Sequence, residues 1–378
     1  MKKSSIYSEI GVNPVINASG TKTTHGGTQM SEDVIEAMKI ASYNFVSIQE
    51  LNEKVGDYIA SITEAEAGMV TSGAASGVVL SIAACMTGTN KALIRQLPDS
   101  SGMKNEVIIQ RIHMGAYAHM YSFSGCKIIE IGNINNCSDV ELRHAINEKT
   151  AAIAYLFGPR ISPSGLSFPE VVSIGKNYSI PVIVDAAAML PPKSNLSEYI
   201  KQGADLVTIS GGKFLKGPQN SGLLFGKKDL IEAAIANSNP NHAIGRPHKV
   251  SKEVIVGLYK ALKNYIALDE EKLLLEYKKR LKEVLPYFSE LKQINAELIH
   301  DWINYSVPVI AISSRNKLLN LKQLPNIMLQ NSPRIFLQYF SELGHLVINP
   351  ISLTVEELKI VAKSLSSNIE ELCKRNKI

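Results

Sequence analysis

The sequence contains little cysteine, and no arrangement of it suggests a metal site. Four cysteines occur among 378 residues, at positions 85, 126, 137 and 373, and no two of them have the C-x-x-C spacing. They form no cluster with histidine at metal-ligand spacing, and so few dispersed thiols do not make a disulfide framework. We therefore expect a protein of a reducing compartment that binds no metal.

Long apolar runs are also missing. The longest apolar stretch, Val78 to Met86, is far shorter than the roughly 20 residues that a membrane-spanning helix needs. The chain start, "MKKSSIYSEIGVNPVINASG", has two lysines followed by polar and turn residues, where a secretory signal would need a continuous apolar segment. These absences predict a cytoplasmic protein with no membrane contact.

The chain has no strong excess of one charge. Forty basic residues against 35 acidic ones leave a formal charge of +5, and the basic residues are not gathered into the Lys/Arg block that an obligate nucleic-acid binder often shows. With 45% hydrophobic residues, the chain is long enough for one large domain and a smaller one. The composition therefore favours a globular protein that can bury an active site, and it does not demand a nucleic-acid partner.

Helices and strands alternate through most of the chain. Two amphipathic helices are predicted between Ser31 and Thr63, the first opening with Ser31 as N-cap and with acidic residues in its first turn. The alternation that follows favours an α/β fold with a mostly parallel sheet, covered on both faces and joined by right-handed crossovers. The predicted segments are a strand, turn and helix at 69–86, strands at 105–111, 127–132, 151–157, 180–187 and 204–210, and helices at 138–148 and 167–179.

Beyond about Arg246 the pattern changes. Residues 252–291 form a long lysine-rich helical region, which leads to a subdomain with strands at 306–313 and 344–350 and a last helix at 354–375. No internal repeat is present. We therefore divide the chain into an N-terminal segment (1–20), a large α/β domain (21–250), and a linker helix with a small C-terminal α+β domain (251–378).

One candidate binding segment follows the first strand of the large domain, at the kind of edge where an open parallel sheet places its ligands. In "VTSGAASG", Val70 to Gly77, the strand turns through Ser72, Gly73 and Ala74 directly into a helix. The free backbone N–H groups and the dipole of such a helix start favour a phosphate. The segment is neither a Walker A nor a G-x-G-x-x-G motif, so a turn of small residues made for close packing is an equally good interpretation.

Two charged residues follow later strands. Asp185 ends the apolar strand of "PVIVDAAA", where it either caps the next segment or holds a positive charge in a dry site. Lys213 lies in the loop "GGKFLKG" after the strand "ADLVTIS", where a surface charge is the alternative. A phosphate cradle, an acid and a lysine are together the parts of a pyridoxal phosphate site, since they anchor the phosphate, keep the pyridine nitrogen protonated and bond the cofactor. The combination favours an enzyme.

Longer segments resemble the selenocysteine-synthase-like family of fold-type I pyridoxal phosphate enzymes. The resemblance rests on "GGTQMSEDVIEAM", "PVIVDAAAMLPP", "GADLVTISGGKFLKGPQNSGLLFGKKDLI" and "IGRPHKVSKEVIVGLYKAL", and it runs from about Val12 to Leu262. This family contains the L-seryl-tRNA(Sec) selenium transferase and D-glucosaminate-6-phosphate ammonia-lyase types. The resemblance implies pyridoxal 5'-phosphate as cofactor, a large domain with a mostly parallel sheet of the seven-stranded type, and a smaller C-terminal α+β domain.

The resemblance also assigns roles to residues of this chain. Lys213 would bond the cofactor, Asp185 would pair with its pyridine nitrogen, and His113 would stack on its ring, unless His113 is a core or surface histidine. The residues expected at the cofactor's phosphate are Ser72, Gly73, Ala74 and Ser210. Met114 stands where lyase-like members carry an arginine, so the substrate need not be a phosphorylated sugar acid.

Four residues are expected to bind the substrate. Arg246 is the first candidate for a substrate carboxylate or phosphate, because a guanidinium binds such groups with two hydrogen bonds and because it lies in a family-like segment. Lys216 takes a position where family members often carry arginine, and it keeps the charge without the two-pronged geometry. His25, in a turn near the chain start, and Arg160, in "FGPRISPSG", complete the set.

The expected activity is that of a lyase. A β-elimination would release ammonia from a small hydroxylated amino acid or amino-sugar acid and leave a 2-oxo acid. The first alternative is a selenium transferase or another transferase or aminotransferase, although a tRNA substrate would call for a basic N-terminal domain and this chain reaches its core motifs within about twenty residues. The second is a non-catalytic relative that acts as a scaffold or regulator. The expected partners are a small amino substrate and a second copy of the chain, in a homodimer or higher oligomer.

Overall fold

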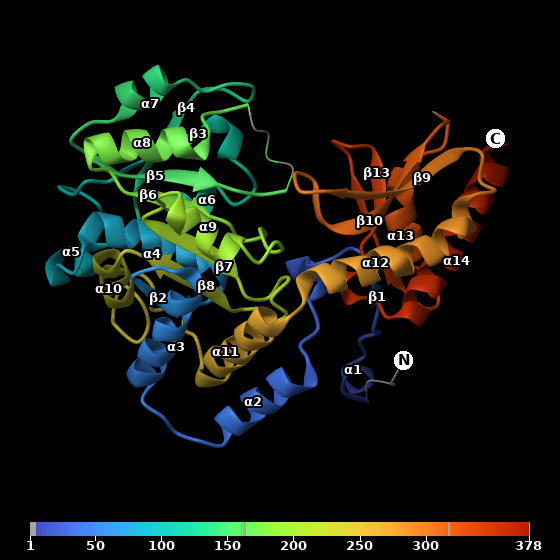
Figure 1. Ribbon diagram of the computed structural model, residues 1–378, viewed down its shortest axis with the longest axis horizontal. Helices are drawn as coiled ribbons and strands as arrows, with labels where there is room; N and C mark the ends of the chain where they lie inside the picture. The colour runs from blue at the N-terminus through green and yellow to red at the C-terminus, as the bar shows by residue number, and fades with distance from the viewer. Residues whose placement is uncertain (1–4, 160, 162–163, 317, 378) are drawn as a thin grey trace. The chain divides into compact units, whose positions relative to one another are not determined.

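The computed structural model describes residues 5–159, 161, 164–316 and 318–377. The chain divides into two compact units: a large unit of residues 30–268, and a smaller unit that joins residues 1–29 to residues 269–378. Figure 1 shows the elements of both, coloured from blue at the N-terminus to red at the C-terminus.

The large unit is built on a seven-stranded sheet with the order β2-β8-β7-β6-β5-β3-β4. All neighbouring strands from β7 to β4 are parallel, while β8 runs antiparallel to both β7 and β2. The strands are β2 (Ala67–Thr71), β3 (Glu106–Gln110), β4 (Lys127–Ile131), β5 (Thr150–Leu156), β6 (Val182–Asp185), β7 (Leu206–Ser210) and β8 (Gly222–Gly226). The expected mostly parallel sheet is therefore present, and β8 is a strand that the sequence had not suggested.

Helices cover both faces of this sheet (Figure 1). The long α4 crosses the middle of one face and packs on β5 to β8, with α5, α6 and α10 beside it, while α3, α7, α8 and α9 belong to the opposite face. The helices of the large unit are α2 (Glu32–Ser42), α3 (Ile48–Thr63), α4 (Gly73–Thr87), α5 (Lys91–Gln96), α6 (His119–Ser122), α7 (Asp139–Ala145), α8 (Phe168–Tyr178), α9 (Asn195–Lys201), α10 (Lys228–Ala236) and α11 (Lys252–Ala267), with a 3-10 turn η2 (Arg111–His113). Because α4 is covered on both sides, 12 of its 15 residues are buried. Its sequence is therefore apolar on every face of the helix instead of on one stripe.

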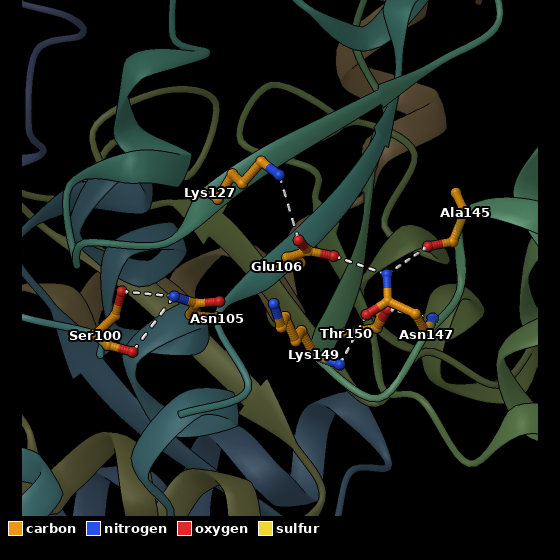
Figure 2. Close-up of polar contacts among 8 residues, drawn as sticks. All are labelled: Ser100, Asn105, Glu106, Lys127, Ala145, Asn147, Lys149 and Thr150. Atoms are coloured by element: carbon orange, nitrogen blue, oxygen red, sulfur yellow. Dashed lines mark hydrogen bonds and ion pairs between the residues drawn. The ribbon is translucent and has the colours of Figure 1, made fainter. Parts of the chain in front are cut away.

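The amino ends of β3, β4 and β5 are tied by a polar network (Figure 2). Glu106, at the start of β3, accepts a hydrogen bond from Asn147 Nδ2 at 2.8 Å and pairs with Lys127 Nζ at 3.4 Å. The Asn147 hydrogen bond, more than the Lys127 charge, lowers the pKa of Glu106. Asn105 donates to Ser100 Oγ at 2.9 Å beside it. This edge of the sheet is thus filled by structural contacts.

The smaller unit has a four-stranded antiparallel sheet of order β12-β13-β10-β9 and a two-stranded pair, β1 with β11. Its strands are β1 (Ile16–Asn17), β9 (Ile294–Asp301), β10 (Tyr305–Ser314), β11 (Ile335–Phe336), β12 (Gln338–Phe340) and β13 (His345–Ile348). Its helices are α1 (Ser5–Glu9), α12 (Glu270–Val284), α13 (Leu324–Met328) and α14 (Val355–Asn376), with 3-10 turns η1 (Thr23–His25), η3 (Leu285–Phe288), η4 (Leu321–Gln323) and η5 (Pro350–Ser352). It is the expected α+β subdomain, with its core between the sheet, α12 and α14.

The two units differ from the expected divisions at residues 20 and 250. The N-terminal segment belongs to the smaller unit, because Ile16 pairs in parallel with Ile335 and is fully buried in that unit's core. The lysine-rich region is two helices rather than one: α11 packs on α2 and α3 in the large unit, and Asp269 caps the start of α12 with a hydrogen bond to the Lys272 N–H. Among the described helices, none has the length and apolar character that a membrane crossing needs.

Candidate functional site

The three segments singled out in the sequence meet at one edge of the large sheet. Thr71, Gly222 and Ser210 stand side by side in the register of β2, β8 and β7, and Asp185 pairs with Thr208 on the next strand. Because β2 has the same direction as β5, β6 and β7, the turn after β2, Asp185 and the loop after Ser210 all leave the sheet at its carboxyl edge.

The turn from β2 into α4 is shaped as an open cradle. Gly73 has φ +79°, and a Cβ at this position would find no atom within 4 Å. The first N–H groups of the 15-residue α4 have no intrahelical acceptor, as at any helix start, and the side chain of the N-cap residue Ser72 does not accept from them. A Cβ on Gly222 would lie 2.8 Å from Ala74 N and 2.5 Å from the Gly73 carbonyl carbon, so β8 supports the cradle from below at a distance that only glycine allows.

Asp185, which is buried, and Lys213, which is half-buried, form a pair of opposite charge. Asp185 is 9% exposed, and its Oδ1 accepts the Ala187 N–H at 3.0 Å. Burial raises the pKa of Asp185, opposed by that hydrogen bond and by the charge of Lys213. Burial likewise lowers the pKa of Lys213, opposed by the charge of Asp185. Each charge therefore offsets part of the desolvation cost of the other.

The loop that carries Lys213 is closed by its own backbone hydrogen bonds. The Gly217 N–H donates to Gly211 O at 2.9 Å, and the Gly211 N–H donates to Ser221 O at 2.8 Å. Phe214 and Leu215 are buried directly after the lysine, and the Phe214 ring packs edge-on against Tyr265. Anchored on both sides, Lys213 has a fixed place of attachment beside β7.

His113 lies just past the carboxyl end of β3 and contacts the end of β5. Its Nδ1 accepts a long hydrogen bond of 3.5 Å from the Leu156 N–H, and Leu156 is the residue that pairs with Asp185 in the sheet. The ring is 3% exposed and packs edge-on against Tyr155, with 4.4 Å between ring centroids. Burial lowers the pKa of His113 to about 4, so at neutral pH the imidazole is uncharged, with the proton on Nε2.

This burial predicts an acid-dependent loss of stability. The folded pKa of His113, about 4, lies below its ordinary value of 6.5, so the unfolded chain binds the proton first as the pH falls. Stability is expected to fall by up to about 3 kcal/mol between pH 6.5 and pH 4. Urea unfolding at a series of pH values should show this slope in the wild type and a flatter one in His113→Gln. An unchanged slope in the variant would mean that other groups carry the pH dependence.

The remaining predicted residues are placed as follows. Ser210 and Lys216 are half-buried, and Lys216 has a left-handed backbone with φ +55°. Arg246 is exposed, and its Nη1 donates to Asn239 Oδ1 at 3.3 Å. His25 belongs to the smaller unit, where it stacks on Phe336 with 3.7 Å between ring centroids and its Nδ1 lies 2.6 Å from Ser19 Oγ. Arg160 lies outside the described residues.

His248 is a residue near the cradle that the sequence had not singled out. Its Nδ1 lies 3.0 Å from Ser76 Oγ in the first turn of α4, and its ring packs against Phe123 with 5.5 Å between centroids. Burial lowers the pKa of His248. The only signal in the sequence was its position in the family-like segment with Arg246, because 172 residues separate it from Ser76.

Comparisons with known proteins identify a family and two related enzymes. The family model for L-seryl-tRNA selenium transferase matches residues 15–279. D-glucosaminate-6-phosphate ammonia lyase from Salmonella typhimurium is 37% identical over 265 residues, which cover 69% of this chain and 70% of that protein. A 5'-C-glycyluridine monooxygenase-decarboxylase from a Streptomyces species is 30% identical over 369 residues, covering 95% of this chain and 90% of that protein.

A solved structure of D-glucosaminate-6-phosphate ammonia-lyase superimposes with a TM-score of 0.85 at 29% identity, covering 98% of this chain and all of that one. The expected fold is therefore confirmed: the protein has the fold of fold-type I pyridoxal phosphate-dependent enzymes. The named relatives are enzymes, which goes against the alternative of a non-catalytic scaffold. Since the family model spans well over half of the sequence, the chain belongs to the L-seryl-tRNA selenium transferase family.

Proposed function

We propose that this protein is a pyridoxal phosphate-dependent lyase that eliminates a β-substituent from a small hydroxylated amino acid or amino-sugar acid, releasing ammonia and a 2-oxo acid. The observation that carries the proposal is the pair of the buried Asp185 and the half-buried Lys213 at the same sheet edge as an open helix start. The ammonia-lyase relative, in sequence and in fold, supports the choice of reaction.

The residues at this edge fit pyridoxal 5'-phosphate. The Gly73 and Ala74 N–H groups at the start of α4, with the Ser72 and Ser210 hydroxyls, offer donors for a phosphate, and the backbone there is open to a ligand. Asp185 offers a buried acid for the pyridine nitrogen, Lys213 an amine for the aldehyde, and His113 an aromatic ring that accepts a hydrogen bond from Leu156, the sheet neighbour of Asp185. When bound, the cofactor supplies an electron sink for a carbanion at the substrate's α-carbon.

The side chains of this protein then bind and orient the substrate and transfer protons. Because burial lowers the pKa of Lys213, a larger share of its Nζ is neutral than in a surface lysine and can accept the α-proton as a general base. The carboxylate of Asp185 holds its partner nitrogen in the charged form. We assign substrate binding to Arg246, Lys216, His25 and Arg160, with Arg246 as the first candidate for a carboxylate because its guanidinium is exposed.

A second candidate is an oxidative decarboxylation. It is favoured by one observation, the Streptomyces monooxygenase-decarboxylase that matches along 95% of this chain. A seryl-tRNA substrate, as the family name suggests, and transamination are further alternatives. We propose that no nucleic acid is bound, since the formal charge of +5 is not concentrated in one segment.

The partner in solution is a second copy of the same chain. Supporting this proposal, the segment from α2 into α3 exposes a group of large apolar side chains, and Phe45 among them is fully exposed. These side chains are Ile35, Ile40, Tyr43, Phe45 and Val46. Light scattering should give a mass of at least two chains, and Phe45→Glu should lower it; a monomeric wild type would contradict the proposal. We also propose a cytoplasmic location, in keeping with four unpaired cysteines.

The test of the function is a product assay on the cofactor-loaded protein. Small hydroxylated amino acids and amino-sugar acids, with and without a phosphate, should release ammonia and a 2-oxo acid in equal amounts without consuming oxygen. Carbon dioxide release coupled to oxygen uptake would support the second candidate instead. Seryl-tRNA serves as a separate substrate, and turnover of it alone would contradict the lyase proposal.

A further inference from the structure

The hydroxyl of Tyr121 is a buried polar atom without a hydrogen-bond partner among the described residues. Tyr121 lies in α6 and is 3% exposed. Three other side-chain atoms of the described chain share this condition, in Asn237, Arg280 and Ser352. Native proteins rarely leave such an atom unpaired without a functional reason or a bound water. Tyr121 is the one we consider further, because the charge of Asp185 acts on its hydroxyl.

Tyr121 packs on the same face of the sheet from which Asp185 projects. It shares a core cluster with Ala154 of β5 and Ile183 of β6. Since side chains alternate along a strand, Asp185 points to the same face as Ile183, two residues earlier. Burial and then the charge of Asp185 raise the pKa of Tyr121, so the field of the carboxylate reaches this hydroxyl.

The carboxylate of Asp185 can accept a further hydrogen bond. Its carboxylate is almost fully buried and accepts one backbone hydrogen bond, from Ala187. A buried carboxylate remains charged when two or three donors, or an opposite charge, compensate for the lost water. Lys213 supplies charge to Asp185 in the free protein, but its amine is engaged with the cofactor in the proposed function. In the loaded site the Ala187 N–H and the pyridine nitrogen supply two donors to the carboxylate, which leaves a place for a third.

We propose that Tyr121 is a positioning residue for Asp185: its hydroxyl donates toward the carboxylate through a buried water and keeps the acid charged and oriented for the pyridine nitrogen. A water suits this place, because a buried water bridges polar atoms that are too far apart for direct contact. The inference rests on the proposed function, since it concerns binding of pyridoxal phosphate at Asp185.

The experiment compares cofactor affinity in four forms: wild type, Tyr121→Phe, Asp185→Asn and the double variant. Each cofactor-free protein is titrated with pyridoxal 5'-phosphate, followed by visible absorption, and its thermal unfolding is recorded without cofactor. Tyr121→Phe is expected to weaken binding roughly tenfold, as for loss of a hydrogen bond to a charged group. The same change in the Asp185→Asn background should have little effect. Tyr199→Phe, a buried tyrosine of α9, is the matched control and should bind as the wild type does.

The outcomes separate this inference from the function on which it rests. A wild type that binds no pyridoxal phosphate overturns the proposed function, and the inference with it. A wild type that binds while Tyr121→Phe binds equally well overturns the inference alone. An equal loss in both backgrounds, or a clear drop in the melting temperature of cofactor-free Tyr121→Phe, would assign Tyr121 to core packing and also overturn it.

Discussion

Replacing Lys213 with alanine is expected to abolish covalent attachment of the cofactor and nearly all turnover. The amine is the only lysine that the structure pairs with Asp185 at this edge of the described chain, and its lowered pKa makes it a base as well as a nucleophile. Loss of a positioned general base alone costs roughly 10²–10⁴-fold, so kcat should fall at least that far.

The measurement is the visible absorption band of the loaded protein before and after borohydride. Wild type should keep the cofactor through denaturation once it has been reduced, and Lys213→Ala should lose it. Lys228→Ala, an exposed lysine in the first turn of α10, is the control and should behave as the wild type does. If Lys213→Ala still traps the cofactor covalently, another lysine bears the bond and the assignment is wrong.

Replacing Asp185 with asparagine is expected to separate function from stability. Asparagine keeps an oxygen for the Ala187 N–H but not the charge that a protonated pyridine nitrogen needs. We expect weaker cofactor binding and a fall in kcat on the order of 10²–10³-fold, as for loss of an electrostatic group at a reacting centre.

The cofactor-free Asp185→Asn protein should unfold at the same temperature as the wild type or higher. Burial raises the folded pKa of this acid above its unfolded value, so the ionised carboxyl at neutral pH opposes folding, and the amide removes that penalty. Thermal unfolding without cofactor and titration with cofactor measure the two effects separately.

Asp205 offers a matched control for this change, because it has the same exposure of 9%. Its carboxylate accepts the Val182 N–H at 2.7 Å and pairs with Lys227 Nζ at 2.7 Å, which are structural contacts at the start of β6 and just past the end of β8. Asp205→Asn should cost about 1–3 kcal/mol of stability and leave cofactor affinity unchanged. Equal loss of cofactor affinity in the two variants would contradict the special role of Asp185.

The segments of the site were recognisable from the sequence because each is local. Ser72 to Ala74, Asp185 and Lys213 each follow an apolar strand within a few residues, and the strand period and turn residues that place them there are properties of short segments. Their order along alternating strands and helices then predicts a common edge for all three. The α/β fold and the smaller α+β part follow from the same local patterns, whereas the family follows from the resemblance of longer segments.

Other parts of the molecule depend on contacts between distant residues. The sequence did not suggest the strand β8, which follows the loop that carries Lys213. Only the pairing of β8 with β2 and β7 brings Gly222 against the turn at Gly73. The chain start lies in the smaller unit because Ile16 finds a strand partner more than 300 residues away, at Ile335. His25 belongs to the same smaller unit, where its ring stacks on Phe336.

The sequence by itself indicated the fold class and the strand ends that carry Asp185 and Lys213, since periodicity and turn chemistry act within one segment, and the resemblance of longer segments indicated the family. Only the tertiary structure decided that the Tyr121 hydroxyl is buried without a partner among the described residues, on the face of the sheet from which Asp185 projects, and that His248 meets Ser76 at the first turn of α4. Both depend on how helices pack against the sheet. Packing is set by the shapes of many side chains at once, so no spacing along the chain records it.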